Sequence, residues 1–306
     1  MFSWLFYSLG SAVTTSLTQV LSKQAILDRR YSNVAIKFVS ALVASAILFL
    51  VAYLYGFPNL DPRFWPAVII TGAINNVSAL MYLRAYQVGE FSSVYSMSLM
   101  TPIFLLLTSF VLLGEKPTLL GAFGVFLTII GLWVAFRKNT PQKNVQDFTK
   151  GNLLGLSVAL LSSLSVNFDK AAALYSNRIF APAATLAFMA LSYGFYLLVR
   201  RQKFFVAKPP LDDSASSLQV GLERKAPWWF AGMPLLLVMG VLSAGGTVLY
   251  NSALLGGFAS YTIAVKRVGV LLGVIWGWLF FKEKDLGKKL LGAAIAIAGV
   301  VAILWS

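Results

Sequence analysis

The sequence contains no cysteine and no histidine, and only 11 of its 306 residues are aspartate or glutamate. Without cysteine the chain has no thiolate nucleophile and no disulfide, and without either residue the usual zinc ligand sets are missing. Histidine is also the most frequent general acid or base in enzymes. So few catalytic groups remain that we expect neither an enzyme nor a bound metal or other cofactor.

Charge of either sign is scarce, whereas apolar residues are abundant. Charged residues make up 12% of the chain and hydrophobic residues 58%, and the mean hydropathy is +0.76. Soluble domains are roughly half apolar and about a quarter charged. The apolar residues fall in blocks of about 20, the length with which a helix crosses a bilayer. We therefore predict an all-α integral membrane protein of the cell membrane, whose net charge of +14 belongs to basic loops rather than to a nucleic-acid surface.

Ten transmembrane helices are predicted, most of them joined by short connections. They cover residues 2–22, 33–55, 64–84, 92–113, 119–136, 152–172, 182–199, 229–252, 259–281 and 286–305. Residues 139–151 form a polar linker between two halves, and 200–228 form a longer basic loop.

The two halves repeat one another. Glu115-Lys116 in the first half corresponds to Glu283-Lys284 in the second, and Lys23 corresponds to Lys170. The sequence thus predicts a five-helix repeat at 1–138 and another at 152–306. Because five is an odd number, the second repeat lies inverted in the membrane. Inverted repeats are typical of transporters with a substrate site near the midplane, and we expect helices 1, 3, 4, 6, 8 and 9 to line it.

Lysine and arginine gather in the odd-numbered connections, so the positive-inside rule places both termini outside.

The fifth and tenth helices carry glycines that permit close approach, either within the chain or across a homodimer. These glycines are Gly124, Gly131, Gly292 and Gly299.

The strongest functional signal is a pair of cations, Lys266 and Arg267, near the middle of the ninth predicted helix. A charge at that depth is costly and usually functional. Thr262, Lys266 and Gly269 share one helix face, which directs Lys266 toward the bundle, while Arg267 lies about 100° further round. The structural alternative is a salt bridge with Asp169, the one acid well away from the connections.

Other polar residues recur along single helix faces. Buried amides and phenols need hydrogen-bond partners, so they are candidates to line a cavity, with helix packing as the alternative. The predicted substrate-binding residues are Lys266, Arg267, Tyr250, Asn251, Asn75, Asn76, Tyr82, Ser98, Thr262 and Asp169.

Three residues outside that set have specific expectations. Pro102 falls in the middle of the fourth predicted helix, where a proline permits a kink. Glu115 occupies a hairpin turn and is expected to cap a neighbouring helix. Lys170 lies near a helix end and is expected to extend toward the interface.

Thr101-Pro102, then Leu113-Gly114-Glu115-Lys116 and its echo Phe281-Lys282-Glu283-Lys284, resemble the EamA-type transporters of the drug/metabolite transporter superfamily. The resemblance implies ten helices in two repeats and the transport of small metabolites. Val265-Lys266-Arg267-Val268 is similar to the ninth-helix pair that binds substrate phosphate in the plastid phosphate translocators. Ser98 departs from those translocators, which have another lysine there. The family usually keeps both termini in the cytoplasm, against the charge count.

The sequence therefore predicts a secondary transporter of a small organic metabolite that works by alternating access. Because the buried charges are mainly cationic, an anionic substrate is favoured. Transport is by exchange or is proton-coupled, and in the latter case Asp169 is the internal proton carrier. The alternative function is an exporter of amino acids or amphipathic cations.

Overall fold

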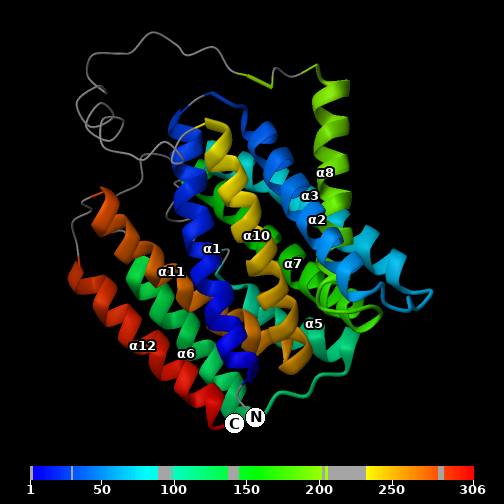
Figure 1. Ribbon diagram of the computed structural model, residues 1–306. Helices are drawn as coiled ribbons and strands as arrows, with labels where there is room; N and C mark the ends of the chain where they lie inside the picture. The colour runs from blue at the N-terminus through cyan, green and yellow to red at the C-terminus, as the bar shows by residue number, and fades with distance from the viewer. Residues whose placement is uncertain are drawn as a thin grey trace, which may run out of the picture.

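The computed structural model describes residues 3–28, 30–88, 97, 99–136, 145–201, 204–205, 232–281 and 286–306, without the side chains of some helical residues among them. Over these residues the chain forms a bundle of helices (Figure 1). The helices are α1 (Ser3–Asp28), α2 (Asn33–Tyr55), α3 (Phe64–Val88), α5 (Thr101–Leu113), α6 (Leu119–Phe136), α7 (Val145–Leu174), α8 (Phe180–Val199), α10 (Gly232–Gly256), α11 (Ala259–Phe281) and α12 (Leu286–Leu304).

The predicted helices are found, but some begin or end elsewhere. The linker predicted at 139–151 is wrong in its second part, because α7 is already helical from Val145. Backbone hydrogen bonding continues a helix beyond the apolar block that sequence hydropathy detects. In the basic loop predicted at 200–228, Phe204 accepts a hydrogen bond from the Ser32 backbone N–H at 3.1 Å, and the residues from 206 onward lie outside the described part.

Pro102 lies at the start of a described helix rather than in its middle. α5 begins at Thr101 after a turn at Leu99 and Met100, so Pro102 occupies its first turn. A first-turn proline is tolerated, since its missing N–H would have no intrahelical partner there. Among the described residues, the proline marks the start of a helix.

Four described helical segments are long and apolar enough to cross a membrane by themselves: Asn33–Tyr55, Lys150–Leu174, Phe180–Val199 and Gly232–Gly256. Large apolar side chains also stay exposed on the outside of the bundle. Leu50, Phe195 and Val241 are 59%, 68% and 56% exposed. Soluble proteins rarely leave so much apolar surface uncovered, and lipid is the solvent that suits it. The chain is thus a helical membrane protein.

Corresponding helices of the two halves run in opposite directions. Trp4, at the start of α1, packs against Gly257, and Lys170, near the end of α7, donates a hydrogen bond to the Gly257 carbonyl. The first helix of one half therefore begins where the first helix of the other half ends. In the same way Glu115, after the end of α5, contacts Ala259 at the start of α11. This is the arrangement that an inverted repeat requires.

The termini lie together at one end of the bundle (Figure 1). Trp4 near the beginning of α1 and Ile303 near the end of α12 belong to one apolar cluster. We call this the terminal end, and the opposite end, which contains Leu21, the far end.

At the terminal end, Glu115 and Lys170 form a buried ion pair. Lys170 Nζ lies 2.5 Å from Glu115 Oε1 and 2.6 Å from the Gly257 carbonyl oxygen. Glu115 Oε2 accepts the backbone N–H of Ala259 at 2.8 Å, which confirms that this glutamate caps a neighbouring helix. The expectation that Lys170 extends to the interface is wrong, because its side chain is only 12% exposed and has two partners inside the protein.

Helices α6 and α12 pack closely through glycines. A Cβ atom on Gly131 would lie 2.3 Å from the Ala296 nitrogen, and one on Gly299 would lie 2.4 Å from the Thr128 nitrogen. The glycine faces are thus covered within the chain. A homodimer through these two helices stays a prediction, and it would have to use their outer, lipid-facing surfaces.

Candidate functional site

A cavity of about 250 Å³ lies inside the bundle, between six helices. These helices are α1, α3, α5, α7, α10 and α11. They correspond to the first, third, fourth, sixth, eighth and ninth predicted helices, which are the ones expected from the sequence to line a central site. Its lining consists of Ala12, Thr15, Ser16, Asn75, Thr101, Ser162, Ser165, Val166, Asp169, Tyr250, Ile263, Lys266, Arg267 and Gly269.

Tyr250 stands between the basic and the acidic groups of the cavity. Its ring centroid is 4.0 Å from Lys266 Nζ, a cation–π contact. Its hydroxyl donates a hydrogen bond of 3.3 Å to Asp169 Oδ2. Lys266 and Asp169 form no direct ion pair in the described structure, so the structural alternative of a salt bridge is not found for Lys266. A phenol ring, which carries no charge, takes the place of a counter-anion for Lys266.

Asp169 is held by α3. The Thr71 hydroxyl donates to Asp169 Oδ1 at 2.7 Å and also lies 2.7 Å from the Ser165 hydroxyl. Ser165 in turn donates to Asn75 Oδ1 at 3.0 Å. Sequence reasoning missed Thr71, although it lies one turn before Asn75 on the same helix face. These bonds tie α3 to α7 and orient the carboxylate in the cavity wall.

Arg267 lines the same cavity as Lys266 and is anchored to α5. Its Nη2 atom donates to the Thr101 hydroxyl at 3.4 Å. Because Thr101 is the first residue of α5, the N-terminus of that helix lies at the cavity wall, where its dipole favours negative charge. Two cations and one acid among the lining residues leave an excess of positive charge.

Comparison with known proteins agrees with this architecture. Residues 2–137 match the family model of the EamA-like transporter family. The match covers a little less than half of the chain, so residues 2–137 are similar to this family.

A solved crystal structure shares the fold of this chain along nearly its whole length. The similarity covers 98% of this chain and 96% of the other, with a TM-score of 0.73 and 11% sequence identity. At that identity the likeness shows the fold alone. A search of curated proteins found no match.

Five of the ten predicted site residues line the cavity: Lys266, Arg267, Tyr250, Asn75 and Asp169. Asn76, Asn251 and Thr262 do not line it. Asn251 is buried and donates to the Thr247 carbonyl at 2.9 Å, and Thr262 donates to the Ala253 carbonyl at 3.4 Å. Ser98 and the side chain of Tyr82 lie outside the described residues.

No group of three or more acidic side chains lies together in the described part of the chain. The groups that line it bind by hydrogen bonds and by charge.

Proposed function

We propose that this protein is a secondary transporter of a small organic anion, which it moves by alternating access around the central cavity. The observation that carries the proposal is Lys266, a lysine in the cavity wall whose described contact is an aromatic ring rather than a carboxylate. A substrate carboxylate or phosphate can provide the charge-assisted hydrogen bond that Tyr250 cannot.

Arg267 and the N-terminus of α5 support the same substrate class. Arg267 presents a planar fork of donors, which suits a carboxylate or phosphate, and the α5 dipole adds partial positive charge. The cavity volume of about 250 Å³ lies below the range of roughly 300–1,000 Å³ for drug-sized ligands. The substrate is therefore small, and the serine and threonine side chains on α1 and α7 offer hydrogen bonds to its polar groups.

Uptake into proteoliposomes tests this proposal. We expect uptake of an anion from a panel of glucose 6-phosphate, gluconate, citrate, glutamine and tetraethylammonium. The substitution Lys266→Ala should lower that uptake by about tenfold or more, because a hydrogen bond to a charged group contributes about 1.5–3 kcal/mol.

The matched control is Lys116→Ala, which removes an exposed lysine from the α5–α6 connection. It should transport at the parent rate. Uptake of tetraethylammonium that is equal in the parent and in Lys266→Ala would contradict the anion site.

An amino acid is the second candidate substrate, because Asp169 lines the same cavity as Lys266 and Arg267. A zwitterion would place its carboxylate at the two cations and its ammonium at Asp169. Tyr250, which contacts both Lys266 and Asp169, keeps the two charged regions apart.

The substitution Asp169→Asn separates the two candidates. For an anion we expect unchanged or faster uptake, since the change removes a repulsive negative charge. For an amino acid uptake should fall by about tenfold or more, because the ammonium group loses its partner. Measuring the uptake of gluconate and of glutamine in parallel decides whether the substrate is an anion or an amino acid.

A further inference from the structure

The cavity is closed at the terminal end by an apolar layer. Leu105, Val166, Leu254 and Ile263 belong to one buried cluster that also includes Tyr250 and Ala259. Val166, Tyr250 and Ile263 line the cavity as well, so this cluster begins directly at its wall. Leu105 and Leu254 are fully buried. Side chains from α5, α7, α10 and α11 thus fill the space between the cavity and this end.

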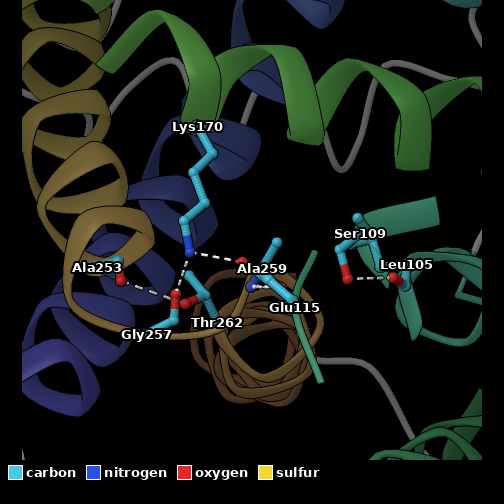
Figure 2. A network of polar contacts seen from close by, with 8 residues as sticks. All are labelled: Leu105, Ser109, Glu115, Lys170, Ala253, Gly257, Ala259 and Thr262. Carbon is cyan, nitrogen blue, oxygen red and sulfur yellow. Dashed lines mark hydrogen bonds and ion pairs between the residues drawn. The ribbon is translucent and has the colours of Figure 1, made fainter. Parts of the chain in front are cut away.

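Beyond the apolar layer lies the buried ion pair of Glu115 and Lys170. Figure 2 shows Lys170 reaching from α7 toward Glu115, Gly257 and Ala259. One lysine and one glutamate therefore join α7, the end of α5, the α10–α11 connection and the start of α11.

The turn after α5 fixes Glu115 in place. Gly114 adopts a left-handed conformation with φ of 68°, and the backbone N–H of Glu115 donates to the Ser109 carbonyl at 3.2 Å. The side chain is 6% exposed. A buried carboxylate that holds both a lysine and a helix N-terminus cannot leave one of them without exposing a charge or a backbone N–H group.

We propose that Glu115 and Lys170 form a latch that keeps the terminal end of the transporter closed, and that the latch must break for the cavity to open there. A transporter that works by alternating access needs each end to open in turn. The latch joins α5, α7, α11 and the connection that follows α10, and side chains from these four helices fill this end. Separating them therefore requires the Lys170 bonds to Glu115 and Gly257 to break.

This proposal rests on the protein being a transporter and not on which substrate it carries. Its test therefore uses no substrate, and failure of the anion proposal leaves the result unaffected. Because the chain has no cysteine, a single introduced cysteine is a unique reporter of access.

The first reporter is Leu254→Cys, in the apolar layer between the latch and the cavity. The second reporter is Leu21→Cys, at the far end. Leu21 is 6% exposed and lies about 25 Å from Trp4 along α1. Both proteins are purified in detergent, where a polar thiol reagent such as a charged methanethiosulfonate reaches both ends. The measured quantity is the rate of thiol modification.

Breaking the latch with Glu115→Gln should raise the modification rate of Leu254→Cys by about tenfold or more, since loss of one charge from a buried pair disfavours the closed state. The rate at Leu21→Cys should stay unchanged or fall. Lys170→Met is a second way to break the latch and should give the same pattern, so the test does not depend on one variant folding.

The matched control breaks a different ion pair at the same end. Asp61 and Arg63 pair at 2.9 Å in the exposed turn between α2 and α3, and Arg63 also covers the Tyr175 ring after α7. The side-chain hydrogen bond from Arg63 lowers the pKa of Asp61 to about 2, so this pair is charged at the assay pH. Arg63→Gln should leave both cysteine rates unchanged.

Two results would overturn the latch. If Leu254→Cys reacts as slowly in both latch variants as in the parent, this end does not depend on the ion pair. If both reporters react faster together, the pair only stabilises the whole bundle.

Discussion

Among single residues, Tyr250 determines the charge distribution in the cavity. Its ring contacts Lys266 and its hydroxyl contacts Asp169, so the two opposite charges share one neighbour without pairing directly. A direct salt bridge would cancel much of the positive charge. With a phenol between them, the charge of Lys266 has no carboxylate beside it in the described structure.

Thr71 is the residue on which the position of Asp169 depends most. We expect Thr71→Val to lower the free energy of unfolding by about 1–2 kcal/mol, because the carboxylate loses its shorter hydrogen bond. The measurement is thermal unfolding in detergent, and the midpoint should fall by a few degrees. Thr71→Ser keeps the hydroxyl and should stay near the parent value. Equal midpoints for Thr71→Val and Thr71→Ser would contradict this role.

How far the site could be predicted differs from residue to residue. Lys266 and Arg267 are visible in the sequence because they interrupt an apolar block. Thr71 is not, since a threonine in a membrane helix satisfies its own backbone as readily as a partner. Thr262 shares a helix face with Lys266, yet it lies one turn closer to the terminal end and bonds to the Ala253 carbonyl. Helix periodicity gives the direction of a side chain but not the depth of the cavity.

At the scale of helices, glycine determines how closely α6 and α12 approach. We expect Gly131→Ala to lower the free energy of unfolding by about 1–3 kcal/mol, because the added Cβ would meet backbone atoms of Ala296 and Gly292 at 2.3 and 2.5 Å. Backbone atoms cannot move aside as a flexible side chain can. Thermal unfolding in detergent measures the change.

Gly245 provides the matched control within α10. A Cβ atom there would meet nothing within 4 Å. Gly245→Ala should therefore be neutral or stabilising by up to about 1 kcal/mol, as the helix propensity of alanine implies. If the two alanine variants unfold at the same temperature, close packing of α6 and α12 does not contribute to stability.

For the helices, the residues at which they begin and end were the least predictable feature. Hydropathy predicted a fourth helix from residue 92. Residues 92–96 and 98 lie outside the described part, and α5 begins at Thr101 with Pro102 in its first turn. Hydropathy also predicted the start of α7 seven residues too late, because Val145–Lys150 is polar yet helical. An apolar block measures the width of the membrane, while a helix ends only where its hydrogen bonds stop.

For the whole molecule, the position of the termini makes a prediction about topology. α1 begins and α12 ends at the same end, so one membrane face carries both termini. The distribution of basic residues predicts that this face is outside. We therefore expect an impermeant thiol reagent to label both Ser3→Cys and Ser306→Cys in intact cells. Labelling of neither would place both termini in the cytoplasm, and labelling of only one would contradict the fold.

The sequence by itself determined that this protein is helical, that it lies in the membrane and that its two halves are related. These properties follow from the length and spacing of the apolar blocks and from an odd number of helices in each half. Each of these can be read from the chain without knowing which helices are in contact. The pair at Lys266 and Arg267 was also evident, because charge inside an apolar block is costly wherever the block packs.

Only the tertiary structure decided which polar groups meet. The contacts of Tyr250 with Lys266 and Asp169, and of Glu115 with Lys170 and Ala259, join residues between 16 and 144 positions apart in the chain. A lysine near a helix end can extend to the interface or pair inside the protein, and its sequence neighbours are the same in both cases. The choice depends on what the other helices bring to it, and that is a property of packing.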